Sequence, residues 1–155
     1  MTGRASKDEE SLNGPGALPL DRRLAYLVLR LSPGINMFIH GGGRIYKGVH
    51  NFVSVTEKLF VDTVLPMWLV HDFLTILPYI EAVIGALLIL GLWTRWALTA
   101  EGLMLIVLVF GTGLRPDWTV VSIQMVYLLT LYVLLAMRQD DHYSLDTLLA
   151  RPRRN

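Results

Sequence analysis

The chain has no cysteine among its 155 residues. This excludes disulfides, thiolate metal sites, cysteine-ligated iron–sulfur clusters and thiol redox chemistry within the chain itself. An excess of one charge is also lacking, because 14 Lys and Arg residues against 13 Asp and Glu residues give a formal net charge of +1. No basic helix with interleaved aromatics is present to follow a phosphate backbone. We therefore expect no nucleic-acid partner.

The signatures of a self-contained enzyme are missing as well. The sequence shows no nucleophile with its base, no metal-ligand cluster and no dinucleotide fingerprint. The glycine triplet Gly41–Gly43 lacks the strand, turn and helix that surround a nucleotide-binding loop. No metal is expected, and electrons for any redox role would come from a donor subunit or an external cofactor. At most the chain is a subunit of an oxidoreductase.

Apolar residues, in contrast, are abundant. They make up 53% of the chain, and the mean hydropathy is +0.46, which indicates one integral membrane domain. Four stretches approach the roughly 20 residues that cross a bilayer. They run from Leu24 to Ile45, Leu77 to Trp93, Arg95 to Leu114, and Trp118 to Met137. The turns between the last three are short, which predicts an all-α, up-down four-helix bundle.

Polar segments flank this transmembrane domain, which we place at residues 23–140. Residues 1–22 lack the apolar core of a signal peptide and predict a flexible cytoplasmic tail. Residues 141–155 form a second cytoplasmic tail, whose Arg151, Arg153 and Arg154 suit anionic headgroups or are merely solvated. With both termini cytoplasmic, nine Lys and Arg residues lie inside against four outside. This predicts an inner-membrane protein.

The connection from Lys47 to Ile76 is the one long segment between spans. It mixes apolar runs with charged residues, which argues against both a free loop and a fifth span. An amphipathic helix that ends before Pro66 could lie in the outer interface or cap the bundle. We therefore predict an interfacial segment between helices 1 and 2 in preference to a disordered loop.

Two buried charges are expected at similar depth near the inner side. Arg30 and Glu101 each lie six residues into their predicted spans, roughly 9 Å deep. An ion pair that fixes helix register is the expected structural role. A proton or substrate role is the alternative.

A second polar group is expected in the outer half, around Glu81. Its carboxyl interrupts an otherwise apolar stretch, and such residues usually face protein or water. His40 and Glu81 both fall roughly 6 to 9 Å from the outer surface. Counting assigns these side chains to a level and does not say which helix face they occupy. The set at this level comprises Asn36, His40, Glu81, Gln124 and Tyr127, with Arg44 and Lys47 at its mouth.

Such a pocket would suit proton-coupled handling of a quinone or another small amphipathic molecule. A histidine or tyrosine can donate to a quinone oxygen, and a desolvated carboxyl can exchange the accompanying proton. A polar network that satisfies itself between helices is the alternative. Quinone is therefore the expected cofactor, if the pocket binds one.

Three segments resemble the DoxX family of small four-span membrane proteins. They are RLSPGINMFIHGGGRI (Arg30 to Ile45), EAVIGALLILGLWTR (Glu81 to Arg95) and YSLDTLLARP (Tyr143 to Pro152). The family has a lysine soon after the first-span glycines, whereas this chain has Arg44 and then Lys47. The resemblance implies a membrane subunit, associated in some relatives with thiosulfate:quinone oxidoreductase and in others with redox or stress-response complexes.

Three functions remain in competition. The first is a quinone-interacting membrane subunit of a redox complex. The second is a non-catalytic anchor or assembly subunit, with residues 47–72 as the docking surface for partner subunits. The third is a small carrier, which four spans could form as a homo-oligomer.

Overall fold

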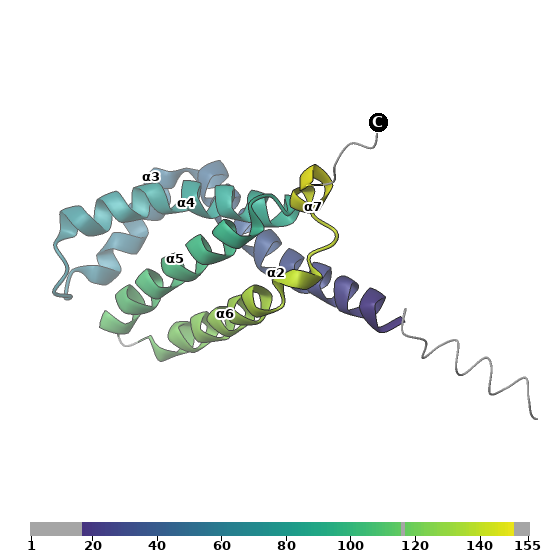
Figure 1. The fold of residues 1–155 in the computed structure, drawn as a ribbon. Coiled ribbons are helices and arrows are strands. Elements are labelled where there is room, and N and C mark those ends of the chain that lie inside the picture. Colours follow the sequence, from purple (N-terminus) through teal and green to yellow (C-terminus); the bar gives the residue numbers. More distant parts are fainter. Residues whose placement is uncertain (1–16, 116, 151–155) are drawn as a thin grey trace, which may run out of the picture.

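The computed structural model describes residues 17–115 and 117–150, and every regular element in that part of the chain is helical. In chain order, these elements are α2 (Ala17–Lys47), α3 (Val49–Thr56), η1 (Glu57–Phe60), α4 (Met67–Leu90), α5 (Thr94–Leu114), α6 (Trp118–Ala136), η2 (Arg138–Asp140) and α7 (Leu145–Ala150) (Figure 1). The all-α prediction is confirmed. Most of the expected N-terminal tail (residues 1–16) and the three C-terminal arginines (Arg151, Arg153 and Arg154) lie outside the described residues.

Within residues 17–115 and 117–150, three helices are long and apolar enough to cross a membrane, judged by length and composition: α4, α5 and α6. The expected first span lies within α2, which is longer, at 31 residues, but is interrupted by several charged side chains. The structure therefore supports an integral membrane protein with three apolar spans. It leaves the four-span, up-down arrangement as a prediction.

The helix that carries Glu81 begins ten residues earlier than expected, at Met67 instead of Leu77. The polar residues His71 and Asp72 lower the hydropathy of its first turns, so an apolar run did not mark the true start of the helix. Both side chains are exposed. The longer helix places Glu81 farther from the start of the helix than expected. It lies ten positions from both His71 and Gly91, about 15 Å from each at 1.5 Å per residue. The carboxyl is thus near the middle of the span.

The closest helix–helix contact joins α2 and α4, which run antiparallel. Gly34 of α2 lies against Leu88, and Gly41 lies against Ala82, so positions rise along α2 as they fall along α4. A Cβ atom on Gly85 would lie 2.7 Å from the carbonyl oxygen of Gly34. Small residues permit this approach in membrane helices. The glycines thereby fix the register of α2 against α4.

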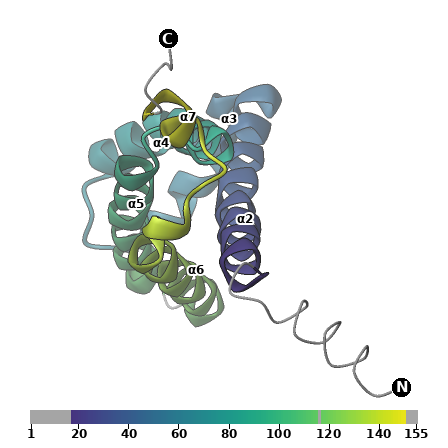
Figure 2. The ribbon, with the colours of Figure 1, turned by 45° about the vertical axis from the view of Figure 1, so that its right-hand side comes forward.

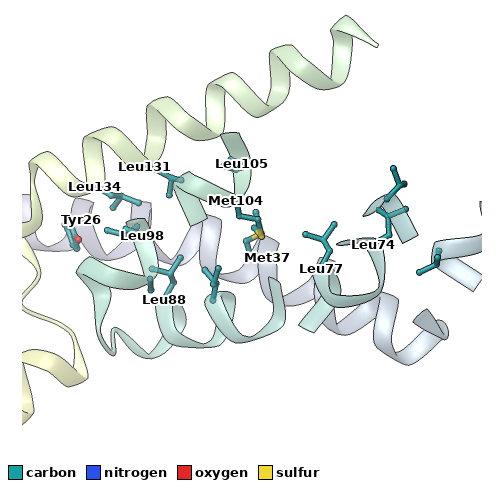
Figure 3. Close-up of a cluster of buried hydrophobic side chains, with 14 residues drawn as sticks. Tyr26, Met37, Leu74, Leu77, Leu88, Leu98, Met104, Leu105, Leu131 and Leu134 are labelled. Atoms are coloured by element: carbon teal, nitrogen blue, oxygen red, sulfur yellow. The ribbon is translucent and has the colours of Figure 1, made fainter. Parts of the chain in front are cut away.

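The apolar core is shared by α2, α3, α4, α5 and α6 (Figure 3). Leu88 of α4, Leu98 of α5 and Leu134 of α6 are fully buried, and Tyr26 of α2 and Val53 of α3 belong to the same cluster. Because α2 contributes to this core, it packs as part of the bundle. It is not an appendage to the three apolar spans.

The connection between α2 and α4 is built from α3 and η1, followed by a short irregular stretch. Val53 of α3 is buried, which anchors the segment to the bundle. Glu57 of η1 contacts Nδ1 of His71 on α4 at 2.9 Å. Residues 49–60 therefore fold back onto the bundle, and α3 lies beside α4 in Figure 1.

The C-terminal segment crosses one end of the bundle from α6 to α7 (Figure 2). The carboxylate of Asp146 accepts hydrogen bonds from the backbone N–H groups of Trp93 and Thr94, each at 2.8 Å. These groups lie at the N-terminus of α5, where backbone donors lack partners within the helix. The N–H of Asp146 also donates to the carbonyl oxygen of Gly91 at 3.0 Å. Residues 141–150 are thus bonded to the bundle.

Candidate functional site: a buried ion pair at an apolar cavity

An ion pair between Arg44 and Glu81 lies at the α2–α4 interface. Arg44 comes from the last turn of α2 and donates through Nη1 to Oε2 of Glu81 in the middle of α4. The side chain of Glu81 is only 4% exposed, while that of Arg44 is 27% exposed. The guanidinium also lies over the ring of Phe52, 4.4 Å from its centroid. Pairing and stacking make the buried carboxylate and the partly buried guanidinium tolerable in an apolar bundle.

The pair borders a cavity of about 370 Å³ between α4, α5, α6 and the α3–η1 segment. This volume falls within the range of roughly 300–1,000 Å³ typical of ligand sites. Most of the lining is apolar and includes Phe60, Leu69, Phe73, Leu77 and Leu108. The lining side chains of α4 run from Leu69 to Glu81, which corresponds to about 18 Å along the helix. The cavity is therefore elongated, with Glu81 at its deep end.

Two further polar side chains, Arg115 and Gln124, lie on the cavity wall toward the end opposite Glu81. Arg115 lies over the ring of Phe60, 4.9 Å from its centroid, and its Nε is buried without a hydrogen-bond partner among the described residues. Gln124 donates through Nε2 to Oγ1 of Thr112 at 3.3 Å, but its Oε1 is likewise unpartnered there. Buried polar atoms usually find partners. These two atoms could therefore bond to a ligand.

The structure brings together three of the predicted ligand residues: Arg44, Glu81 and Gln124 line the same cavity. His40 is exposed and lines a separate hollow between the end of α2 and α3. Tyr127 does not line this cavity and packs against the buried hydrophobic cluster. Counting along helices grouped these residues at one level, but it could not predict which face each side chain occupies. Arg115 was missed as a cavity residue because its place in a short turn gave no sign of an inward side chain.

Arg30 has a different partner from the one predicted. Its side chain is 1% exposed, pairs with the carboxylate of Asp141 and donates to the carbonyl oxygen of Tyr143 at 2.8 Å. Burial raises the pKa of the Asp141 carboxyl above its usual range, and the positive charge of Arg30 opposes that shift. The expected Arg30–Glu101 ion pair is wrong, because the C-terminal segment folds back and supplies Asp141 instead. Both carboxyl oxygens of Glu101 are buried without a partner in the described part of the chain.

These features define a class of protein: a helical membrane protein whose bundle forms an apolar cavity with an ion pair at its deep end. Comparison with family models matches residues 28–155 to the family described as TQO small subunit DoxD. The chain belongs to this family, which confirms the resemblance to DoxX-type proteins. No curated protein and no solved structure matches the chain in the corresponding comparisons.

Proposed function

We propose that this chain is a quinone-binding membrane subunit of a redox complex and that the quinone occupies the cavity next to Glu81. The main support is the lining itself. An elongated apolar cavity carries a buried ion pair at one end and unpartnered polar atoms of Arg115 and Gln124 on its wall. A quinone has the matching shape, because its apolar ring and chain carry oxygens that need hydrogen bonds. The chain belongs to the family of the small subunit of thiosulfate:quinone oxidoreductase (TQO), and this membership also supports a quinone as the ligand.

The residues at the deep end have distinct roles in this proposal. Arg44 donates a hydrogen bond to a ligand oxygen while it remains stacked on Phe52. Glu81 holds or releases a proton at its carboxylate, since proton exchange accompanies electron transfer to a quinone. The apolar wall excludes water from the exchange. A bound quinone would supply the two-electron chemistry, and a partner subunit would supply the electrons.

The same proposal includes the membrane topology. We propose that α2 is the fourth span, because Arg30 and Arg44 are both paired and need not face lipid. The bundle is then up-down, with both termini on one side of the membrane. The excess of basic residues on that side supports a cytoplasmic location in the inner membrane. Protease protection of tags placed at each terminus of the protein in membrane vesicles tests this topology.

Filling the cavity tests ligand binding without altering a charge. Gly111 lines the cavity, and a Cβ there would lie 3.6 Å from the ring of Phe60, which is an ordinary contact. Gly111→Leu should therefore fold and should lower the affinity for a short-chain benzoquinone at least tenfold. Gly113 is the matched control, since a Cβ there meets nothing within 4 Å. Equal quinone affinity in Gly111→Leu and Gly113→Leu would count against the cavity as the site.

An assembly role without ligand chemistry is the second candidate. It is favoured by the group of exposed charged side chains at the Pro66 end of the bundle, which are Lys58, Asp62 and Asp72. Exposed charges of this kind can position a partner subunit. Co-purification of partner subunits with the variant Asp62→Lys/Asp72→Lys tests this role. Loss of partners with unchanged quinone affinity would favour assembly at this surface.

A further inference from the structure

A second hollow, separate from the cavity next to Glu81, lies between the end of α2 and α3. Its volume is about 530 Å³. Side chains of His40, Arg44, Lys47 and Asn51 line it, together with Ile39 and Val55. Only Arg44 and neighbouring residues of α3 border both spaces.

The lining of this hollow is positively charged. Arg44 and Lys47 are cationic, and no acidic side chain lines the hollow. Glu81 neutralises Arg44 from the other side of the α2–α4 interface. Lys47, in contrast, forms no ion pair within residues 17–115 and 117–150. The hollow is therefore suited to an anion.

The depth of the hollow indicates where that anion would come from. Gly41 lies against Pro78, Lys47 is six residues further along α2, and His71 is seven residues back along antiparallel α4. At 1.5 Å per residue, Lys47 and His71 lie at nearly the same level, about 9–10 Å beyond this contact. This is the level at which α4 begins to expose charged side chains, as expected at the boundary between hydrocarbon and headgroups.

The apolar side of the hollow faces outward. Ile39 is 65% exposed and Val55 is 66% exposed, and both lie beside the basic groups. A lipid would meet both surfaces at once, because its phosphate is joined to acyl chains. A free anion in water would meet only the basic side. The juxtaposition of charge, depth and exposed apolar surface favours a lipid.

We propose that this hollow binds the headgroup phosphate of an anionic lipid. Lys47 and the imidazole N–H of His40 contact the phosphate oxygens, and the amide of Asn51 lies beside them on α3. The amide already donates to the carbonyl oxygen of Lys47 at 3.3 Å, which ties α3 to the end of α2. Ile39 and Val55 contact the first part of the acyl chains. This site is independent of the quinone proposal.

Lipid titration of the full-length, delipidated protein in detergent tests the site. The probe is phosphatidylglycerol in mixed micelles, and lipid binding is measured by native mass spectrometry. Lys47→Gln should weaken binding about fivefold, the loss expected when one basic group near the membrane surface is removed. Lys58→Gln is the matched control, since Lys58 is an exposed lysine on η1 that does not line the hollow.

Three results would overturn the proposal. Equal weakening by Lys47→Gln and Lys58→Gln would show general surface attraction. Equal binding of phosphatidylcholine and phosphatidylglycerol would remove the role of net lipid charge. The melting temperature of the protein could also rise as much with inorganic phosphate as with phosphatidylglycerol. That result would indicate a site for a free anion.

Discussion

Arg44 and Glu81 are paired across the α2–α4 interface, although 37 positions separate them in the sequence. The pair forms because α2 and α4 run antiparallel with glycines at their contact. That register places the last turn of α2 beside the middle of α4. The backbone contact between the two helices thus determines which side chains can meet at the end of the cavity.

The glycine contact should be intolerant of even one methyl group. A Cβ on Gly41 would lie 3.0 Å from the Cα of Ala82 and closer still to the carbonyl oxygen of Pro78. We expect Gly41→Ala to destabilise the bundle by about 1–3 kcal/mol, the usual cost of overpacking. Gly42→Ala is the control, because a Cβ there meets nothing within 4 Å. Thermal unfolding in detergent measures both, and equal melting temperatures would contradict the contact.

Arg30 and Asp141 should be the most sensitive ion pair for stability. The Arg30 side chain is nearly inaccessible, so Asp141→Asn would leave a buried cation without its counter-ion. Breaking a buried pair from one side costs about 3–5 kcal/mol. The exposed pair between Arg22 and Asp140 offers the comparison, since Arg22→Gln should cost at most about 1 kcal/mol. Chemical denaturation in mixed micelles ranks the two, and a larger effect of Arg22→Gln would contradict this structure.

Asp146 should act as a cap for α5 from a distant part of the sequence. Asp146→Ala removes the acceptor for two backbone N–H groups, those of Trp93 and Thr94. Loss of a side-chain cap costs about 0.5–2 kcal/mol. Hydrogen exchange should become faster at the start of α5 and in α7. The exposed carboxylate of Asp62 provides the control, and faster exchange in Asp62→Ala at the same amides would refute a specific cap.

Glu101 and Glu81 should respond oppositely to an apolar substitution. Glu101 is fully buried, and neither carboxyl oxygen has a partner among the described residues. Glu101→Leu removes a desolvated polar group and should raise stability by about 1–3 kcal/mol. Glu81→Leu should lower stability, because it leaves Arg44 unpaired beside the apolar cavity. A fall in melting temperature for both variants would indicate that Glu101 has a partner.

Sequence reasoning succeeded where an apolar run is bounded by short turns. The predicted start of the third span at Arg95 differs by one residue from Thr94, the first residue of α5. The predicted end of the fourth span at Met137 differs by one residue from Ala136, the end of α6. The start of α4 was missed because exposed charges follow Met67 within two turns.

The site was only partly predictable, because depth along a helix says nothing about its rotation. Glu81 and Gln124 were grouped by depth and do share the cavity, whereas Tyr127 at similar depth faces the core. The partner of Arg30 could not be found by the same counting. Asp141 lies 111 positions away, in a segment that was expected to be a tail.

Quinone titration of purified Glu81→Gln, with Glu101→Gln as the matched control, tests the central claim most directly. Both variants replace a buried glutamate by its neutral isostere, but only Glu81 lines the cavity. Size-exclusion profiles and helical circular dichroism establish that each variant is folded. We predict that a short-chain benzoquinone binds the wild type and Glu101→Gln equally, and Glu81→Gln at least tenfold more weakly. Equal affinity in all three folded proteins would contradict a quinone site at Glu81.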